Sequence, residues 1–398
     1  MPTAVIVDAV RTAGGKRNGR LSGWHPADLA AETLKALVER NGLDPTLIDD
    51  VIMGCVMQVG GQALNVARNA VLAANFPESV PATTVDRQCG SSQQSLHFAA
   101  QGVMAGAYDV AVAAGVEVMS LVPMGASVAV PNVGGPFGPR VEERYRPDGG
   151  LVPQGISAEM IADRWGLTRE DLDAYGARSQ QRAARATAEG RFEREIVAVP
   201  ARVRDKETGR VVEPGEMVTA DEGIRPETTT EALATLKPAF KPDGKVTAGN
   251  SSQITDGASA VLVMSEEKAG ALGLVPRARF HAFALSGVDP VTMLTGPIPA
   301  TTKVLERAKL TLEDIDLVEI NEAFASVVLA WAEEHHPDMA KVNVNGGAIA
   351  LGHPLGASGT KLAATLLNEL ERTGGRWGLL TMCEGGGLAN ALVIERLG

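Results

Sequence analysis

The sequence predicts an α/β fold built from two related halves. Residues 37–51 read LVERNGLDPTLIDDV and residues 304–318 read VLERAKLTLEDIDLV, a match at an offset of 267 residues (304 minus 37). Each copy has the pattern of a helix, a short turn and an apolar strand. The same offset sets DVAVAAGVE at 109–117 opposite RWGLLTMCE at 376–384. Helix–turn–strand units can look alike by chance, but a constant offset favours a duplicated α/β core.

Between the two copies lies a segment of different composition. It contains Pro/Gly-rich stretches such as VPNVGGPFGPR and one candidate amphipathic helix, LTREDLDAYGARSQQRAARATAEG. The apolar run AVLVM that follows is expected to be a closing strand of the first half. We therefore assign residues 1–120 and 246–270 to an N-terminal core half, residues 121–245 to an inserted loop domain, and residues 271–398 to a C-terminal core half.

Composition narrows the possible functions. The 398 residues are 45% hydrophobic and 21% charged, as in ordinary soluble globular proteins. A formal net charge of −11 argues against a nucleic-acid partner, which normally meets a basic face. No apolar run approaches the length of about 20 residues that a membrane span needs, and the N-terminus lacks the pattern of a signal peptide. The expected location is the cytoplasm.

Three widely spaced cysteines without a CxxC motif predict neither a disulfide framework nor a zinc site. Cys89 stands out because it follows a strand-like ATTVD and precedes a stretch with apolar residues at helical spacing. A cysteine at a helix N-terminus is favoured as a thiolate. The small residues after it leave room for a substrate. The alternative is a buried structural cysteine, which is how we interpret Cys55 in DDVIMGCVMQ.

Two further motifs place polar side chains at predicted strand ends. The strand IDLVEI runs into Asn321-Glu322-Ala323-Phe324, and ligand sites of open α/β sheets lie at such carboxyl ends. Asn321 could instead be a simple helix cap. LLTMCEGGGLAN puts Cys383 at the end of an apolar strand, and the glycines after it can present backbone N–H groups to an oxyanion.

The histidine with the most distinctive surroundings is His353. It lies in NGGAIALGHPLGASG, at residues 345–359, among glycines that permit close backbone approach. A tight turn without chemistry is the alternative. Two cysteines, a histidine and an asparagine at strand ends suggest acyl-thioester chemistry, in which one thiolate holds the acyl group and the imidazole removes its proton. The second thiol would move a proton, and no metal is required.

With these residues the sequence resembles the thiolase family over essentially the whole chain. The stretch around Cys89, NEAF at 321–324, GGAIALGHPLGASG at 346–359 and C-x-G-G-G at 383–387 match family signatures in family order. The likeness is greatest to actinobacterial-type degradative acyltransferases. It implies a thiolase fold of five layers, αβαβα, and a homodimer or homotetramer.

The resemblance also implies a role for each site residue. Cys89 would form the acyl-enzyme, His353 would activate it, and Cys383 would deprotonate the thiol of coenzyme A or the methyl group of acetyl-CoA. Asn321 would hold a water molecule in one oxyanion hole, and the N–H groups of Cys89 and Gly385 would form another. Coenzyme A would be a substrate, with no permanently bound cofactor. Contacts to coenzyme A or the acyl group would come from Arg225, Leu236, Ser252, Gln154, Ala323 and Phe324.

Two positions depart from the family pattern. Short-chain biosynthetic members carry His-Met-Gly where this chain has Pro153-Gln154-Gly155, which favours a different or larger acyl pocket. Glu384 follows Cys383, where small or apolar residues are usual. A carboxylate there could raise the pKa of the thiol, but we expect it to point away from the site.

The expected reaction is thiolysis of a 3-ketoacyl-CoA by coenzyme A, giving acetyl-CoA and a shortened acyl-CoA. A short-chain acetoacetyl-CoA thiolase of biosynthesis and a steroid-ring-degradation thiolase are alternatives within the family. A cysteine hydrolase would give the second thiol no role. A ketoacyl-synthase-type enzyme would want two histidines where Asn321 and Cys383 stand, and a non-catalytic lipid-binding relic would lack at least one of these residues.

Overall fold

Two sets of strands with the same internal order make up the main sheet of the chain, seen here in a computed structural model that describes residues 2–398. The N-terminal set runs, in spatial order, β1 (Ala4–Thr12), β11 (Thr255–Ser265), β5 (Val110–Val118), β3 (Asp50–Gly54) and β4 (Ala82–Val85). The C-terminal set runs β12 (Ala278–Gly287), β15 (Leu388–Arg396), β14 (Trp377–Glu384) and β13 (Leu317–Ile320).

The predicted internal repeat is present in the strand order. An offset of 267 residues carries β3 onto β13 and β5 onto β14, and each pair occupies the same place in its set. In the C-terminal set, a parallel bridge between Val318 of β13 and Val342 takes the place that the pairing of β3 with β4 has in the N-terminal set. The sequence did not reveal that β1 and β12 also pair, through Ile6 and Ala278, so that both sets form one continuous sheet.

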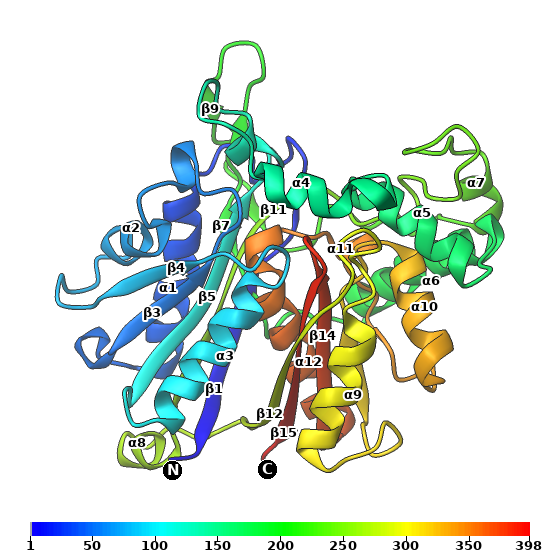
Figure 1. Cartoon of the computed structure of the whole chain (residues 1–398). Helices are drawn as coiled ribbons and strands as arrows, with labels where there is room; N and C mark the ends of the chain where they lie inside the picture. The colour runs from blue at the N-terminus through cyan, green and yellow to red at the C-terminus, as the bar shows by residue number, and fades with distance from the viewer. Residues whose placement is uncertain (1) are drawn as a thin grey trace.

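Helices divide the molecule into five layers (Figure 1). The central layer consists of α3 (Ser91–Met104) and α12 (Ser358–Thr373), which pack on each other and on strands of both sets. The outer layers are α1 (Pro26–Asn41) and α2 (Val66–Ala73) on one side, and α9 (Pro297–Ala308) and α10 (Ala325–His335) on the other. The αβαβα arrangement expected from the sequence is therefore confirmed.

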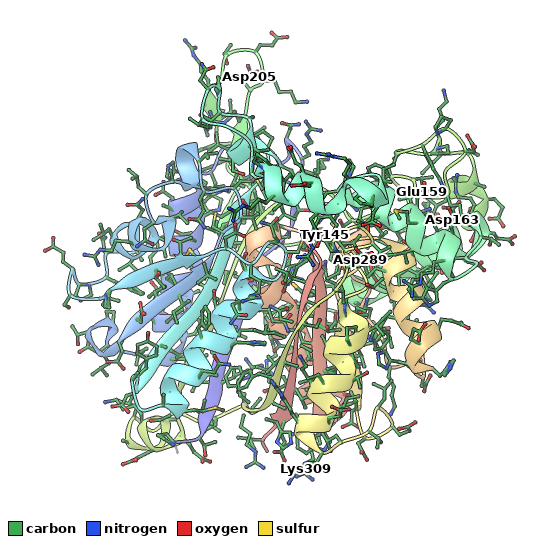
Figure 2. All side chains as sticks on the ribbon, viewed as in Figure 1. Tyr145, Glu159, Asp163, Asp205, Asp289 and Lys309 are labelled. Carbon is green, nitrogen blue, oxygen red and sulfur yellow. The ribbon has the colours of Figure 1, made fainter. Side chains whose placement is uncertain are left out.

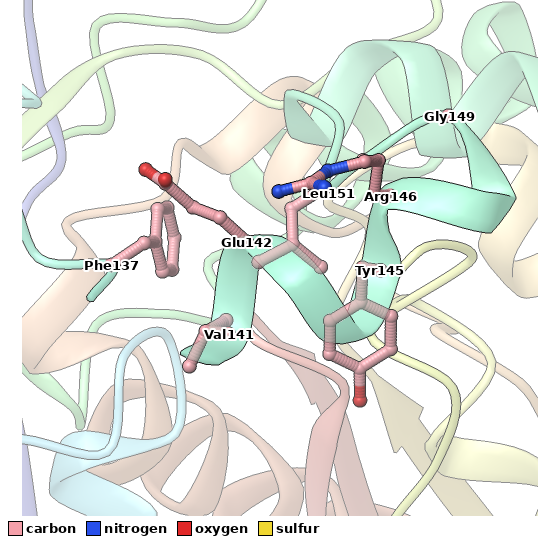
Figure 3. A pocket seen from close by; sticks show the side chains of 8 residues that line it. Phe137, Val141, Glu142, Tyr145, Arg146, Gly149 and Leu151 are labelled. Atoms are coloured by element: carbon pink, nitrogen blue, oxygen red, sulfur yellow. The ribbon is translucent and has the colours of Figure 1, made fainter. Parts of the chain in front are cut away.

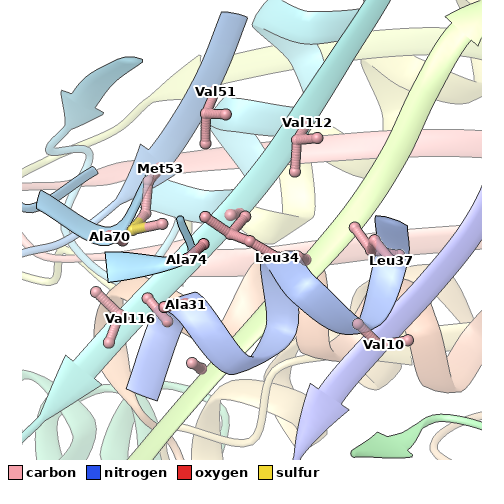
Figure 4. Close-up of a cluster of buried hydrophobic side chains, with 14 of the residues drawn as sticks. Val10, Ala31, Leu34, Leu37, Val51, Met53, Ala70, Ala74, Val112 and Val116 are labelled. Atoms are coloured by element: carbon pink, nitrogen blue, oxygen red, sulfur yellow. The ribbon is translucent and has the colours of Figure 1, made fainter. Parts of the chain in front are cut away.

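Side-chain alternation along the strands explains why both faces of each set are covered. In β1, Val5 and Val10 join the outer apolar cluster with Leu34 and Leu37 of α1 (Figure 4). Ile6 points the other way, into the cluster that surrounds α3 and α12. Strands buried on both faces read as nearly continuous apolar runs, which is how β1, β5 and β11 appear in the sequence.

Glycines let the central helices approach the strands closely. A Cβ atom on Gly115 of β5 would overlap the carbonyl oxygen of Gly356, and one on Gly54 would overlap the amide of Ser92. The N-terminus of α3 and the loop before α12 are therefore both pressed against the same strand ends. This close approach positions the chemical groups described below.

The inserted segment is fastened to the core by buried charge. Arg11 of β1 is fully buried and binds Glu195 (Nε to Oε1, 2.6 Å) and Asp221 (Nη1 to Oδ1, 2.7 Å), both from the insertion. Glu159, labelled with Asp163 on α5 in Figure 2, accepts the amides of residues 245 and 246 at 2.9 Å.

The elements of the insertion are α4 (Pro139–Tyr145), α5 (Gln154–Arg164), α6 (Arg169–Ala188), α7 (Thr230–Ala234), and the strand pairs β7 (Val199–Pro200) with β10 (Met217–Val218) and β8 (Val203–Arg204) with β9 (Val211–Val212). The short β2 (Gly15–Lys16), β6 (Ile196–Val197), α8 (Glu266–Ala271) and α11 (Ala348–Leu351) complete the chain. The domain boundaries stay a prediction. Within residues 2–398, no helix has the length and apolar character required to traverse a bilayer.

Candidate active site

Parallel strands bring the predicted site residues to a common end of the molecule. β3 runs parallel to β4 and β5, and β13 runs parallel to β14. Cys89 lies in the loop after β4, Asn321 directly follows β13, and Cys383 is the last residue but one of β14. The carboxyl ends of parallel strands meet at one edge, as ligand sites of open sheets require.

Cys89 precedes the N-cap residue of α3 and is 5% exposed. Its burial and the nearby Glu384 raise the pKa of the thiol to about 12, although the N–H groups of Gly385 and Cys89 and the side chain of Gln154 act to lower it. The helix N-terminus was expected to favour a thiolate, but burial outweighs that effect. The resting thiol is therefore protonated and needs a base.

His353 is held as a neutral base. Its Nδ1 lies 2.5 Å from Oγ of Ser358, and that hydroxyl donates to the carbonyl of Pro354 at 2.9 Å. Since the hydroxyl proton is committed, Nδ1–H is the donor to Ser358 and Nε2 carries the lone pair. Asn321 Nδ2 lies 3.4 Å from Nε2. Burial and the charge of Lys361 lower the pKa of the imidazole to about 3.

Replacement of Ser358 by alanine tests this orientation. Ser358→Ala removes the acceptor for Nδ1–H, so the imidazole can rotate or adopt the other tautomer. We expect kcat for acyl transfer to fall about tenfold, the equivalent of one hydrogen bond of roughly 1.4 kcal/mol, with a smaller change in KM. Steady-state kinetics and the thermal midpoint, measured together, separate this loss from unfolding. An unchanged kcat contradicts the assigned tautomer.

Cys383 is fully buried at the end of β14. Burial, and the proximity of Cys89 and Glu384, raise the pKa of its thiol well above the ordinary value. Asn321 lies beside it, because the amide of Asn321 donates to the carbonyl of Thr381 at 3.1 Å. The two thiols and the Asn321–His353 pair thus belong to one cluster.

The loop that carries His353 is attached to the helix that follows Cys89. The amide of Thr360 donates to Oγ of Ser92 at 3.1 Å, which places this loop at the N-terminus of α3. The N–H groups of Gly385 and Cys89 both approach the Cys89 sulfur. These are the two donors assigned to the predicted oxyanion hole, and their role there stays a prediction.

The residues predicted to contact coenzyme A fall into three places. Arg225 and Leu236 line one apolar groove of about 370 Å³ on the insertion. Ser252 donates its amide to the carbonyl of Ala323 at 2.9 Å, and the neighbouring Phe324 meets Phe240 edge to face with ring centroids 6.0 Å apart. Gln154, at the start of α5, contacts the sulfur of Cys89.

An apolar cavity lies on the insertion just before Gln154. Phe137, Val141, Tyr145 and Leu151 line a volume of about 380 Å³ (Figure 3). In Figure 1, α4 and α5 lie across the end of the molecule at which β5 and β14 finish. The segment that lines this cavity runs into α5, whose first residue, Gln154, contacts the Cys89 sulfur.

Sequence reasoning missed two residues that hold the histidine loop. Lys361 is buried, and its ammonium group donates to the carbonyls of Leu351 (2.5 Å) and Gly352 (2.9 Å), which precede His353. Glu322 accepts from the hydroxyl of Ser179 at 2.6 Å and from the amide of Ile349 at 3.2 Å. Its position next to Asn321 was a signal that could have found it.

The expectation that Glu384 points away from the site is wrong. Its side chain is fully buried and packs against Gly90, where an added Cβ atom would overlap Oε1 of Glu384. The carboxylate raises the pKa of both Cys89 and Cys383. Glu384 therefore lies against the N-terminus of α3, where its charge acts on both thiols.

This arrangement is suited to moving an acyl group between thiols. A protonated thiol lies before α3, the neutral imidazole lies in the loop bonded to the N-terminus of that helix, the second thiol interacts with the first, and two backbone N–H groups approach the nucleophile. Within residues 2–398, no cluster of three or more His, Cys, Asp or Glu side chains is arranged to hold a metal ion.

Comparison with known proteins places the chain in a family. The model of the thiolase N-terminal domain matches residues 4–267, and that of the thiolase C-terminal domain matches residues 274–396. The chain belongs to the thiolase family and is an acyltransferase.

Individual relatives are similar over their whole length. A steroid 3-ketoacyl-CoA thiolase of Mycobacterium tuberculosis is 50% identical over 100% of this chain and 95% of its own. A 3-ketoacyl-CoA thiolase of Bacillus subtilis is 47% identical over 99% of this chain and 100% of its own. The crystal structure of the Bacillus anthracis acetyl-CoA acetyltransferase superposes with a TM-score of 0.89, at 40% identity, covering 100% of this chain and 99% of that one.

Proposed function

We propose that the protein catalyses the thiolytic cleavage of a 3-ketoacyl-CoA by coenzyme A, yielding acetyl-CoA and a shortened acyl-CoA. The observation that carries this proposal is the pair of buried, interacting thiols Cys89 and Cys383, with the neutral imidazole of His353 in the loop bonded to the helix that follows Cys89. One thiol is enough for hydrolysis, whereas cleavage of a carbon–carbon bond also needs an acid for the carbanion that leaves. The reverse reaction is a Claisen condensation.

In the first half-reaction, Nε2 of His353 takes the proton of Cys89, and the sulfur attacks the 3-keto carbon. The bond between C2 and C3 breaks with its electron pair on C2, Cys383 donates the proton that completes acetyl-CoA, and the shortened acyl group stays on Cys89. In the second, the Cys383 thiolate takes the thiol proton of coenzyme A, whose sulfur attacks the acyl-Cys89 thioester. The departing Cys89 sulfur recovers its proton from His353.

The oxyanions formed in these steps need donors at both carbonyl groups. We propose that the N–H groups of Cys89 and Gly385 stabilise one of them, and that Asn321, through a water molecule, stabilises the other with His353. The convergence of the first two N–H groups on the Cys89 sulfur supports the first assignment. The contact of 3.4 Å between Asn321 and His353 supports the second.

We propose an acyl group larger than acetoacetyl as the substrate. Phe137, Val141 and Leu151 supply an apolar cavity close in sequence to Gln154, and Gln154 replaces the residue that short-chain biosynthetic relatives carry. Coenzyme A itself would lie along Arg225 and the groove beside it. A steroid side chain or ring is favoured by one relative's name, and acetoacetyl-CoA is the alternative. We also propose a cytoplasmic homodimer or homotetramer.

A substrate series tests the reaction and its range together. Purified protein is mixed with coenzyme A and acetoacetyl-CoA, a medium-chain, a long-chain or a steroid-derived 3-ketoacyl-CoA, and the products are separated by chromatography. We expect acetyl-CoA and a shortened acyl-CoA in equal amounts, with a higher kcat/KM for the larger substrates. Free acid formed without coenzyme A would indicate a cysteine hydrolase. A preference for acetoacetyl-CoA would contradict the larger pocket.

A further inference from the structure

Glu384 is a fully buried carboxyl group beside the catalytic thiols. Within residues 2–398, neither of its carboxylate oxygens has a hydrogen-bond partner. The side chain of Glu384 packs against Gly90, the residue that follows Cys89. Glu384 itself follows Cys383 in β14. A buried carboxylate without partners costs several kcal/mol, so such a group is normally absent or serves a purpose.

The internal repeat provides a direct comparison for this position. At the offset of 267 residues, Glu384 of β14 corresponds to Glu117 of β5, which is equally buried. Glu117 accepts hydrogen bonds from the amides of Val56 (2.9 Å), Met57 (3.1 Å) and Gly356 (2.9 Å), and from the side chain of Gln62. In the N-terminal half this carboxylate is a structural anchor with four N–H donors, and the Cys55 thiol lies 3.9 Å from its Oε1.

The equivalent donors do not bind Glu384 in the C-terminal half. The same offset makes Ala323, Phe324 and Cys89 the counterparts of the three amides that bind Glu117. The amide of Ala323 donates to the carbonyl of Asn321 at 3.0 Å, and the amide of Cys89 is directed at its own sulfur. Glu384 therefore does not accept a hydrogen bond from the Cys89 amide, which we assign to the oxyanion hole.

The charges around Glu384 are few. Arg87, in the loop before Cys89, favours the carboxylate, and Asp86 opposes it. Burial has the largest effect and raises the pKa of Glu384 to about 8, so that the group is neutral at pH 7. When ionised, it raises the pKa of the thiols of Cys89 and Cys383. The neighbouring side chain from β15, Asn390, is uncharged.

We propose that Glu384 is a positioning residue for the thiolase reaction, and that its carboxyl group must be protonated for the two catalytic thiols to ionise in turn. At neutral pH the cluster then carries only the negative charge that moves between Cys89 and Cys383 during turnover. At alkaline pH, the carboxyl group of Glu384 loses its proton, and the resulting negative charge opposes formation of the thiolates. The effect on turnover rests on the thiolysis proposed above. The effect on thiol reactivity does not depend on that reaction.

The test measures thiol reactivity rather than turnover. The rate of alkylation of Cys89 by iodoacetamide is followed by peptide mass spectrometry as a function of pH, for the wild type and for Glu384→Gln. Below about pH 8 the two proteins should react alike, because Glu384 is neutral. Above it, the wild-type rate should level off while that of Glu384→Gln continues to rise, with a difference of about tenfold if the carboxylate shifts the thiol pKa by one unit.

Glu117→Gln is the matched control. It removes a carboxylate from the equivalent position in the other half, where the group is a structural anchor. We expect a lower thermal midpoint, because one carboxylate oxygen becomes an NH2 group that faces buried donors, and no change in the pH dependence of alkylation. Glu384→Gln should show the opposite pattern, with a changed pH dependence and an undiminished thermal midpoint.

Superimposable alkylation profiles for Glu384→Gln and wild type would overturn the proposal. If Glu384→Gln does not fold, Glu384→Met removes the same charge, and the infrared carbonyl band of a protonated carboxyl, recorded in the wild type at pH 7, gives a second measurement; its absence also overturns the proposal. Loss of the alkaline decline in thiolysis should accompany the alkylation result. Divergent alkylation profiles in a protein without thiolysis would refute the proposed function and leave the role of Glu384 in thiol ionisation intact.

Discussion

Cys89→Ala should lower thiolysis at least about 10⁴-fold, to the level of the reaction without the covalent step. The sulfur is the atom that carries the acyl group, and no other group in the cluster can replace it without moving. Brief mixing of the variant with acetyl-CoA, followed by mass spectrometry of the intact protein, should show no acetyl adduct. The wild type should show one adduct, on Cys89, that added coenzyme A discharges.

Cys55→Ala is the matched control for this experiment. Cys55 is buried in the outer core of the N-terminal half, where its thiol is 3.9 Å from Glu117. We expect its replacement to leave the acetyl adduct and the rate of thiolysis unchanged, at a small cost in stability. An adduct on Cys55 or Cys383 in the Cys89→Ala variant would sink the assignment of the nucleophile.

Cys383→Ala should separate the two halves of the reaction. Acylation of Cys89 by acetyl-CoA should persist, because the thiolate of coenzyme A can leave without a proton donor. Thiolysis should fall about 10³-fold, because the carbanion of acetyl-CoA has no acid and the incoming thiol has no base. Rapid-mixing experiments should therefore show an acyl-enzyme that accumulates on Cys89 and discharges slowly.

The result of Cys383→Ala distinguishes a two-thiol mechanism from a simpler one. Turnover at the wild-type rate would mean that the second thiol takes no part and that His353 moves every proton. Loss of the acyl-enzyme itself would instead show that Cys383 is needed to orient Cys89. Far-UV circular dichroism checks that the buried substitution in β14 has not unfolded the protein.

The parts of the fold that repeat were predictable from the sequence. The helix–turn–strand motif that became α1 to β3 recurs as α9 to β13, and its apolar spacing is regular in both copies. The helix after Cys89 was predicted from the same kind of spacing and is observed as α3. Helix and strand periodicity depends on residues close in sequence, so these elements can be predicted without knowing the tertiary structure.

The features that escaped prediction depend on residues distant in sequence. The pairing of β1 with β12 joins residues about 270 positions apart, and the burial of Arg11 depends on two carboxylates from the insertion. The direction of Glu384 could not be read, because strand alternation is fixed only when the face occupied by its neighbour is known. The motifs predicted that Cys89, His353 and Cys383 are catalytic. Which group donates and which accepts each proton could be inferred only from the folded structure.

The interleaved central layer has a consequence for how the chain folds during its synthesis. α3 covers the inner face of β3 and β5, but the same face of β1 and β11 is completed only by α12, which is followed by the last two strands of the chain. A nascent chain that ends before α12 therefore leaves the part of the inner apolar cluster that α12 covers exposed. Premature termination before α12 should therefore yield a fragment that aggregates more readily than the full chain.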